Sequence, residues 1–441
     1  MKISLITLGC AKNIADSENI LGLLKAKNYD VEAESSKADV FIINTCTFIK
    51  SATNENLDLI IDLANKKAKI IIIGCLAERY KLELFKEFPE VRIIIGTGDL
   101  NNIINALEWL KENFDNSLQK SFLTKEKGYI AASDTPKILL NKTVSAFVKI
   151  AEGCNHRCTF CIIPSLRGQF RSRNQEDIIK EIKSLVALGI KEVNLVSQDS
   201  SSYGIDLYKK RALGDLLNRI AGETSVEWLR IMYCYPFELD KEALQAIYKH
   251  KSILKYIDMP LQHSHPNILR QMARPKNSRE AIKIIRDSLG DFCLRTTFIT
   301  GFPNEIEEEF EDLVNFIKEE KFDRLGVFTY SHEDFPRDIE LKDNISQKIK
   351  EKRKKTLMEL QMEISLKKNQ ALIGKEELVL IESEFNGNFL ARTFRDAPEI
   401  DCTVHVKSKE QNKDLIGKFI KVKIYDAKAY DLYADIAESG I

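Results

Sequence analysis

The chain contains the run Val148-Lys149-Ile150-Ala151-Glu152-Gly153-Cys154-Asn155-His156-Arg157-Cys158-Thr159-Phe160-Cys161. A strand-like segment leads directly into three cysteines with the spacing C-x3-C-x2-C. Three soft thiolates on one short loop favour a [4Fe-4S] cluster, and a set of three leaves one iron free to hold another molecule. Zinc is a competing interpretation, although closed zinc sites usually take four ligands. Three packed cysteines without metal are the other alternative, but crowded thiols oxidise readily.

The region around this loop alternates between strand-like and helical patterns. Six strands are predicted, at Ser145–Ala151, Glu192–Val196, Trp228–Met232, Tyr256–Met259, Leu294–Thr300 and Arg324–Tyr330. Six strand-helix units predict a partial (βα)6 barrel over residues 142–345, whose functional groups would lie at the carboxyl ends of the strands. Whether the barrel closes is not encoded in the pattern.

Residues 1–125 predict a separate α/β domain with a parallel sheet. Its strands are expected at Ile3–Leu8, Val40–Asn44, Ile70–Ile73 and Arg92–Ile95, and its helices at Asp16–Ala26, Ser51–Lys67 and Glu78–Glu87. Residues 126–141 lose the alternation and are interpreted as a linker.

A second set of cysteines follows three strands of this first domain. Cys10, Cys46 and Cys75 each come just after a predicted strand. If these strands are neighbours, ~5 Å apart, the thiols converge at the carboxyl edge of the sheet. Gly9 and Gly74 would let the backbone approach a bulky inorganic ligand closely. One such cysteine is usually inert core, but three equivalent ones predict a second [4Fe-4S] cluster.

The other cysteines and the histidines carry weaker signals. Three isolated cysteines are interpreted as buried, unreactive thiols: Cys234, Cys293 and Cys402. His156 lies between two cluster cysteines, and we expect it to sit outside the metal's coordination sphere. His263 and His265 favour a place in a substrate pocket over metal binding, because they have no carboxylate partner in sequence.

The C-terminal third predicts two further elements. Residues 346–369 form a charged helix, interpreted as a solvated connector whose apolar face holds Ile349, Leu357, Leu360 and Ile364. Residues 370–441 contain short alternating runs at Glu377–Glu382, Thr403–Lys407 and Phe419–Tyr425, with turns at Asn386-Gly387 and Gly417. This spacing favours a small antiparallel β-barrel.

Composition excludes several classes of protein. The chain has 441 residues, 66 Lys plus Arg and 66 Asp plus Glu, so a globally basic nucleic-acid binder is excluded. Nine cysteines are too sparse for a disulfide scaffold. No apolar run approaches the ~18 residues of a membrane helix, and the N-terminus lacks the pattern of a signal peptide. We therefore expect a cytoplasmic protein without a membrane partner.

Two motifs resemble a known enzyme family. Residues 151–164 are similar to the cluster loop of radical S-adenosylmethionine (SAM) enzymes, in the form used by methylthiotransferases. Leu8-Gly9-Cys10-Ala11-Lys12-Asn13, followed by Asp16-Ser17-Glu18, resembles the amino-terminal domain of the same family. The resemblance covers almost the whole chain and implies a TRAM-like terminal barrel. It also implies a transferase with two [4Fe-4S] clusters and SAM.

The family has two main branches, one acting on an adenosine of transfer RNA and one on an aspartate of a ribosomal protein. Residues 9–13, 164–168 and 396–401 resemble the protein-modifying branch. This implies methylthiolation at the β-carbon of an aspartate in the twelfth protein of the small ribosomal subunit. The slight acidic excess of the terminal barrel suits a basic protein better than RNA. The transfer-RNA branch and a non-catalytic iron-sulfur electron carrier or scaffold are the alternatives.

The resemblance also assigns roles. The cluster of Cys154, Cys158 and Cys161 would bind and cleave SAM, and the cluster of the first domain would deliver sulfur that a second SAM methylates. No catalytic side chain is expected beyond the cluster ligands. Candidate SAM-pocket groups are Phe160, at the adenine face, with Gln198, Asp199, Gly301 and Glu305. Solvated or helix-capping roles are the alternative for Asp199 and Glu305. An electron donor such as a flavodoxin or ferredoxin, a sulfur donor and a monomeric state are expected.

Overall fold

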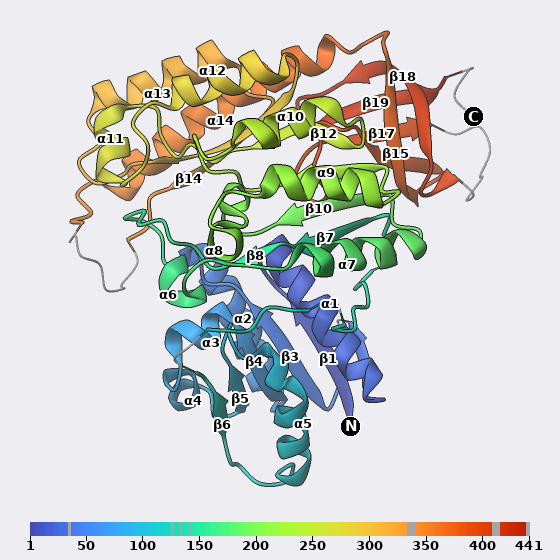
Figure 1. The fold of residues 1–441 in the computed structure, drawn as a ribbon. Coiled ribbons are helices and arrows are strands. Elements are labelled where there is room, and N and C mark those ends of the chain that lie inside the picture. Colours follow the sequence, from blue (N-terminus) through green and yellow to red (C-terminus); the bar gives the residue numbers. More distant parts are fainter. Residues whose placement is uncertain are drawn as a thin grey trace.

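The computed structural model describes residues 1–33, 37–124, 127–132, 134–141, 143–332, 341–407 and 415–437. Three domains follow one another along the chain, with the N-terminal domain at the bottom of Figure 1 and the C-terminal barrel at its upper right. The predicted linker includes residues 126 and 133, which lie outside the described residues.

The N-terminal domain is built on a parallel sheet with the strand order β2-β1-β3-β4-β5-β6. Its strands are β1 (Lys2–Thr7), β2 (Asp30–Ala33), β3 (Val40–Thr45), β4 (Lys69–Gly74), β5 (Val91–Ile95) and β6 (Lys120–Phe122). Ile70–Ile73 of β4 are fully buried because helices cover both faces of the sheet. The sequence predicts the four central strands; the two short edge strands, β2 and β6, lack a clear apolar pattern.

The helices of this domain are α1 (Ala11–Ala26), α2 (Lys50–Asn65), α3 (Cys75–Tyr80), α4 (Glu83–Glu87) and α5 (Ile103–Glu112). α1 and α5 pack on one face of the sheet, and α2, α3 and α4 on the other. The predicted helix at Glu78–Glu87 is wrong in one respect. It is two short helices, separated at Lys81, whose φ of 49° ends the first.

The middle domain holds a second parallel sheet, in the order β14-β13-β12-β11-β10-β7. The strands are β7 (Ser145–Lys149), β10 (Glu192–Val196), β11 (Trp228–Ile231), β12 (Ile253–Asp258), β13 (Cys293–Thr300) and β14 (Arg324–Thr329). A small hairpin of β8 (Ala151–Glu152) and β9 (Arg171–Ser172) flanks the cysteine loop. β7 and β14 do not pair with each other, so among the described residues the sheet is a partial barrel.

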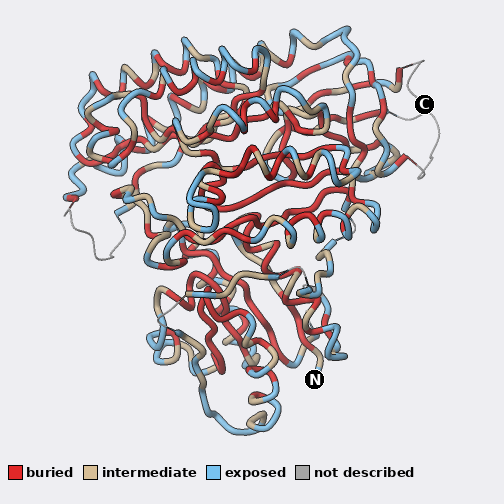
Figure 2. Tube along the Cα trace, viewed as in Figure 1, coloured by how far each residue is buried: buried red, intermediate tan, exposed pale blue. Residues whose placement is uncertain are grey.

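The helices of the middle domain cover the outside of this sheet (Figure 1). They are α7 (Gln175–Ala187), α9 (Leu213–Glu223), α10 (Lys241–Lys249), α12 (Ser278–Leu289) and α13 (Glu307–Glu320). The short helices α6 (Ile163–Arg167), α8 (Ile205–Tyr208) and α11 (Pro266–Gln271) contribute none of the described residues of the core between these helices and the sheet, and α6 contacts α3 of the N-terminal domain. Figure 2 shows the strands buried along their length and the helices exposed on their outer sides, as expected for helices packed on a core.

Helix α14 (Gln347–Gln370) corrects the prediction of a solvated connector. It packs against β14 and α13, and its fully buried residues are mostly polar: Lys350, Arg353, Leu357, Gln361, Ser365 and Asn369. Ile349, predicted on the apolar face, is 44% exposed. Gln361 donates from Nε2 to the carbonyl oxygen of Phe322 at 2.9 Å. Three residues of the predicted apolar face, Leu357, Leu360 and Ile364, do pack against the core of the middle domain, whereas the polar residues of the buried face carry no hydrophobic signal in the sequence.

The C-terminal domain is a closed five-stranded barrel in the order β15-β16-β17-β19-β18. Its strands are β15 (Glu376–Phe385), β16 (Asn388–Arg392), β17 (Thr403–Lys407), β18 (Phe419–Ala427) and β19 (Asp431–Ile436). It contacts the amino ends of the middle strands, where the ring of Trp228 meets that of Phe419 with centroids 4.8 Å apart. The barrel therefore lies at the opposite end of the sheet from the cysteine loop.

The segment Asp396–Asp401 fastens this barrel to the middle domain. Asp396 accepts a hydrogen bond from Nε of Arg324 at 2.9 Å, and Asp401 accepts one from the hydroxyl of Tyr256 at 2.7 Å. Among the helices that the structure describes, we find none with the length and apolar character needed to span a bilayer.

Candidate functional site

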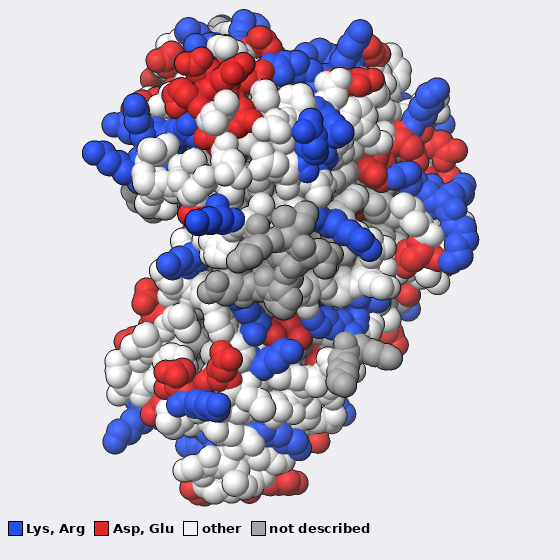
Figure 3. Space-filling view, turned by 90° about the vertical axis from the view of Figure 1, so that its left-hand side faces the viewer, with Lys and Arg blue, Asp and Glu red and all other residues white. Residues whose placement is uncertain are grey.

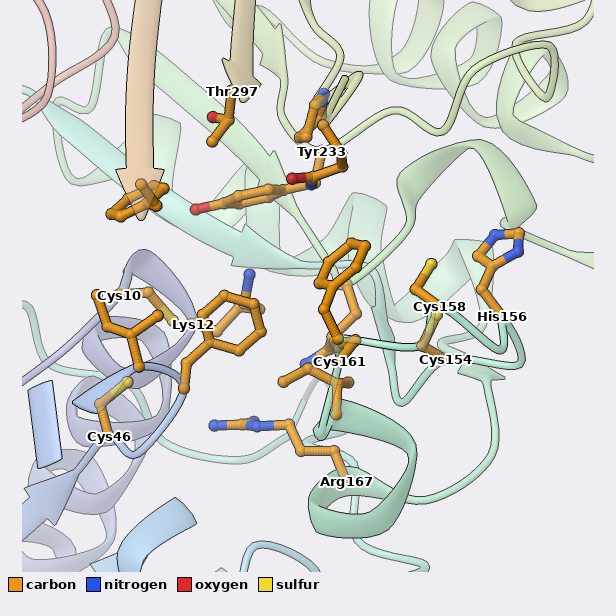
Figure 4. Close-up of a pocket in the computed structure, with 18 of the residues that line it drawn as sticks. Cys10, Lys12, Cys46, Cys154, His156, Cys158, Cys161, Arg167, Tyr233 and Thr297 are labelled. Atoms are coloured by element: carbon orange, nitrogen blue, oxygen red, sulfur yellow. The ribbon is translucent and has the colours of Figure 1, made fainter. Parts of the chain in front are cut away.

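A cavity of about 490 Å³ lies between the N-terminal domain and the carboxyl ends of the middle strands (Figure 4). Its volume is in the range of small-molecule and cofactor sites. Both predicted cysteine sets line it: Cys10, Cys46 and Cys75 from the first domain, and Cys154, Cys158 and Cys161 from the second. Cysteines as far apart in the sequence as Cys10 and Cys154, which are separated by more than 140 positions, therefore line the same cavity.

The first set arises from the predicted edge of the N-terminal sheet. β1, β3 and β4, which precede Cys10, Cys46 and Cys75, are direct neighbours. Gly9 has a φ of +103°, and a Cβ there would lie 2.5 Å from Cβ of Cys46. The glycine thus permits two cysteine loops to approach each other, rather than only admitting a ligand as the sequence suggested. Gly74 has a φ of +91° and turns the chain into α3.

Asparagine side chains hold these loops in place. Asn13 donates from Nδ2 to the carbonyl oxygens of Leu8 and Thr45, at 2.9 Å in each case. Asn56 donates to the carbonyl oxygen of Cys46 at 3.0 Å and accepts from its N–H at 3.3 Å. Because all of these atoms are buried, the hydrogen bonds fix the backbone around the thiols. Sequence reasoning missed both asparagines.

The second set lies on the loop between β8 and α6. The N–H of Cys154 donates to the carbonyl oxygen of Gly168 at 3.2 Å, and the N–H of Cys161 donates to that of Cys158 at 3.0 Å. Arg274 approaches this set, with Nη1 lying 3.8 Å from Sγ of Cys158. The loop is therefore anchored by backbone hydrogen bonds on one side and by a cation on the other.

A stack of planar groups supports the loop. The Nε2–H of His156 donates to Oδ2 of the Asp199 carboxylate at 2.7 Å, and the His156 ring stacks on Tyr235 with centroids 3.6 Å apart. The guanidinium of Arg274 lies 4.0 Å from the centroid of the Tyr235 ring. His156 points away from the three sulfurs in Figure 4, which agrees with its expected place outside the coordination sphere.

The pKa values of the thiols bear on whether this site can hold a metal cluster. Burial, followed by the neighbouring thiols, raises the pKa of Cys46 and of Cys161 to about 12, and burial raises that of Cys154 to about 11. Such thiols become ligands only when a positive centre takes the place of their protons. Cys10 differs, because Lys12 and Arg167 outweigh burial and lower its pKa.

The spacing of the side chains favours a cluster over a single ion. Among the described residues, no three His, Cys, Asp or Glu side chains converge closely enough to hold one metal ion. A tetrahedral zinc site requires such convergence, whereas the thiolates of a [4Fe-4S] cluster bind different irons and lie farther apart. Each set of three thiols is a donor set whose chemistry fits an iron-sulfur cluster.

A buried ionic network joins the two domains beside the cavity. Arg167, at the end of α6, donates to both carboxylate oxygens of Glu152 at 3.0 Å. Its Nη2 also donates to Oδ1 of Asn13 at 3.2 Å and to Sγ of Cys75 at 3.5 Å, both in the N-terminal domain. Burial alone would raise the pKa of Glu152, but Arg167 and Lys149 hold it far below its usual range. The carboxylate is therefore ionised and compensated.

The five predicted pocket groups fall into two classes. Phe160 and Gln198 line the cavity, and Gln198 donates from Nε2 to Glu152 at 2.6 Å while its Oε1 has no partner. The other three are not among the lining residues. Asp199 caps the turn that follows β10, accepting from the N–H of Ser201 at 3.1 Å.

The remaining two contact helix α14 instead of the cavity. Gly301 packs against the side chain of Lys350. Glu305 accepts from the N–H of Phe302 at 2.9 Å and pairs with Arg353 at 3.1 Å. In this structure Glu305 closes the turn before α13 and pairs with a residue of α14, so its contacts are neither those of a helix cap nor those of a pocket residue.

The histidine pair does not face the cavity. Among the described residues lining it, neither His263 nor His265 appears. His263 is buried and accepts from the N–H of His265 at 3.0 Å, and burial lowers its pKa to about 3. The expected place in a substrate pocket is wrong. Cys234, Cys293 and Cys402 are buried, as predicted, and Cys234 also borders the cavity.

Sequence reasoning missed the cations and tyrosines around the cavity. They are Lys12, Arg167, Tyr233, Tyr235, Arg274 and Arg295. Lys12 and Arg167 lie close to the cysteine motifs, so their positions were available as a signal. Tyr233 and Tyr235 follow β11, where functional residues of a parallel sheet collect. Arg274 follows no strand, and only the folded structure brings it to the loop.

The fold and the cavity define the class. An open parallel barrel with C-x3-C-x2-C at the carboxyl end of its first strand is the architecture of the radical SAM superfamily, and the chain matches that family over residues 148–317. Residues 2–96 match an uncharacterized protein family, UPF0004, and residues 373–437 match the TRAM domain. The expected fold class and TRAM-like barrel are confirmed.

Curated relatives then identify the family. The chain is 42% identical over 442 residues to ribosomal protein uS12 methylthiotransferase RimO of Thermoanaerobacter sp. (strain X514), which covers 98% of this chain and 99% of the relative. It is 42% identical to the protein of that name from Clostridioides difficile (strain 630), covering 99% of each chain. The chain belongs to the RimO family of radical SAM methylthiotransferases.

Solved structures agree on the fold. The radical SAM methyltransferase TsrM of Kitasatospora setae, solved with tryptophan and a SAM analogue, matches with a TM-score of 0.55 and 14% identity, over 74% of this chain and 73% of that one. The cobalamin-dependent radical SAM enzyme OxsB matches with a TM-score of 0.50 over 81% of this chain and 56% of that one, also at 14% identity. These likenesses concern the fold alone.

Proposed function

We propose that this protein inserts a methylthio group at the β-carbon of an aspartate of ribosomal protein uS12, using two [4Fe-4S] clusters and SAM. The observation that carries the proposal is that one cavity is lined by a cysteine trio from each of two domains. An aliphatic C–H bond offers no leaving group and little acidity, so side-chain acids and bases cannot functionalise it and cofactors must supply the chemistry.

The two trios would hold the two clusters. Cys154, Cys158 and Cys161 would hold the one that supplies an electron for the cleavage of SAM, and the trio of the first domain would hold the one that carries sulfur. The protein contributes orientation and exclusion of water. Asn13 and Asn56 fix the N-terminal thiol loops, and the Arg167–Glu152 network holds the two domains against each other.

Phe160 and Gln198 are the proposed SAM contacts. The ring of Phe160 offers an apolar face for the adenine, and the unpartnered Oε1 of Gln198 is a buried acceptor awaiting a donor. Asp199 would act indirectly, by orienting His156 behind the cluster loop. Gly301 and Glu305 would act through α14, which they contact.

The partners are part of the proposal. A ribosomal-protein substrate implies action in the cytoplasm, with a flavodoxin or ferredoxin as electron donor, a separate sulfur donor and a monomeric enzyme. Figure 3 shows both basic and acidic side chains on the described part of one face. The equal numbers of basic and acidic residues in the chain suit a protein substrate better than transfer RNA.

The test is direct. The anaerobically reconstituted enzyme, reduced and supplied with SAM and sulfide, is incubated with uS12 and, separately, with unmodified transfer RNA. We expect uS12 alone to gain the mass of a methylthio group replacing one hydrogen, on an aspartate-containing peptide. Modification of the RNA alone would establish the other branch, and absence of SAM cleavage would establish an electron carrier or scaffold.

A further inference from the structure

Four cationic side chains line the cavity: Lys12, Arg167, Arg274 and Arg295. Two of them already have carboxylate partners, since Arg167 pairs with Glu152 at 3.0 Å and Arg295 pairs with Asp258 at 2.9 Å. Arg274 donates to the carbonyl oxygen of Pro260, approaches Sγ of Cys158 and stacks on Tyr235. Lys12 shares with Arg274 the lack of an ion pair among the described residues, but it differs from Arg274 in its place, because it reaches from the N-terminal domain into the space between the two cysteine sets.

Lys12 has no carboxylate within ion-pair distance among the described residues. Its Nζ donates to the carbonyl oxygen of Ser197 at 3.3 Å and lies 3.7 Å from the ring centroid of Tyr233. The residue is only 8% exposed. A buried ammonium is costly to maintain without an anion, and a cation–π contact offsets only part of that cost. Apart from the thiol of Cys10, two residues before it, Lys12 has no anionic partner within ion-pair distance among the described residues, so Nζ can take a negatively charged ligand in the cavity.

The position of Lys12 places this charge between the two cysteine sets. It lies in the first turn of α1, two residues after Cys10, and it reaches across the domain boundary. Ser197 directly follows β10, and Tyr233 lies two residues beyond the end of β11. Both therefore belong to the carboxyl edge of the partial barrel. Figure 4 shows Nζ of Lys12 in the space between the sulfurs of the N-terminal domain and those of the cluster loop.

The neighbour that backs Lys12 is held under strain. Tyr233 has a φ of +62°, a left-handed conformation that is unfavourable for a residue with a bulky side chain. Its N–H donates to Oδ2 of Asp258 at 3.1 Å, which keeps the backbone in this conformation. Strain of this kind is concentrated at ligand-binding sites, where the surrounding structure maintains it.

We propose that Lys12 binds the side-chain carboxylate of the substrate aspartate. This inference rests on the proposed function and deepens it, because it names the group that selects aspartate. The β-carbon that reacts is bonded directly to that carboxylate, so an ion pair at Nζ of Lys12 holds the carbon between the two cysteine sets. An amide in place of the carboxylate would leave the ammonium without its counter-ion.

The experiment measures binding rather than turnover. Fluorescence anisotropy gives the affinity of the reconstituted full chain for a labelled uS12 loop peptide that carries the target aspartate, and for the same peptide with asparagine. We expect the enzyme to prefer the aspartate peptide by about tenfold or more, the order of one buried charge-assisted hydrogen bond. Lys12→Gln should abolish the preference, and Lys12→Arg should restore part of it.

Lys25→Gln is the matched control, because Lys25 is an exposed lysine on the same helix and the charge change is identical. It should keep the full preference. The inference is overturned if Lys12→Gln retains the preference for the aspartate peptide. It is also overturned if the substitution lowers the affinity for both peptides equally, or lowers the affinity for SAM instead. If the parent enzyme modifies uS12 and these outcomes occur, only the role of Lys12 fails. If the parent enzyme neither binds nor modifies uS12, the proposed function fails first.

Discussion

The guanidinium of Arg167 donates a hydrogen bond to Sγ of Cys75 at 3.5 Å, from the cluster loop of one domain to the thiol of another. The same side chain carries the charge that compensates Glu152. Arg167 therefore has two roles: it links the two domains, and it places a positive charge beside the thiols of the N-terminal domain. Groups that hydrogen-bond to a metal ligand orient that ligand and tune the metal it binds.

Arg167→Lys tests this relationship. Lysine keeps the positive charge but lacks the planar fork that reaches both oxygens of Glu152 together with Cys75. We expect methylthiolation to fall by about 10–100-fold, the range observed when groups behind metal ligands are changed. Thermal unfolding should shift to a lower temperature, because buried hydrogen bonds of the domain boundary are lost, so the rate is compared at equal iron content and well below that temperature. A product rate equal to that of the parent enzyme would show that charge alone suffices.

The two cysteine trios should separate two activities. Cys154→Ala should abolish formation of 5'-deoxyadenosine, which chromatography detects. Cys10→Ala should spare much of it while ending sulfur insertion into uS12, because Cys10 belongs to the other domain. Equal loss of both activities in the Cys10 variant, with its second cluster intact by spectroscopy, would contradict this division of labour.

Much of the cavity could be predicted from the sequence. The carboxyl ends of adjacent parallel strands must meet, so Cys10, Cys46 and Cys75 could be placed together once β1, β3 and β4 were expected as neighbours. The C-x3-C-x2-C spacing located the other half. Local patterns of this kind survive in a single sequence because they depend on period and position alone.

The rest depends on contacts across domains. Arg167 meets Asn13 across 154 positions, and α14 buries a polar face whose partners are distant carbonyl groups. Asp199 and Glu305 follow strand ends, as pocket residues would, but Asp199 caps a local turn and Glu305 binds the N–H of Phe302 and the side chain of Arg353. A position at a strand end thus predicts where the backbone of a residue lies, but it does not predict which groups its side chain contacts.

The iron bound by the protein should divide between the two cysteine trios. Anaerobic reconstitution is expected to give about eight irons per chain, the sum of two four-iron clusters. Replacing Cys10, Cys46 and Cys75 together by alanine should lower this to about four, by iron and sulfide analysis. Cys402→Ala, which removes a buried thiol remote from the cavity, should leave it unchanged. A parent enzyme that holds only four irons would contradict the two-cluster proposal.

Acid should weaken the attachment of the C-terminal barrel. Glu192 of β10 is fully buried and accepts from Nε of Arg230 at 2.8 Å and from Arg392 of the barrel. Burial alone would raise its pKa, but Arg392 and Arg230 lower it to about 2. A carboxyl whose pKa is lower in the folded state stabilises the fold above its unfolded pKa, near 4.5, and this stabilisation is lost as the pH falls from there towards 2.

We expect the free energy of unfolding to fall by up to about 3 kcal/mol across that window, at about 1.4 kcal/mol for each unit of pKa difference. Urea titrations followed by tryptophan fluorescence report the loss, because Trp228 packs against Phe419 at this interface. Glu192→Gln should be less stable at pH 7, since it leaves Arg230 without a carboxylate partner and Arg392 with Glu382 alone, and should lose part of the acid dependence. Glu227→Gln, at an exposed ion pair with Lys191, is the control and should keep it. If the free energy of unfolding of Glu192→Gln falls with pH as steeply as that of the parent protein, Glu192 is not the group responsible for the acid sensitivity.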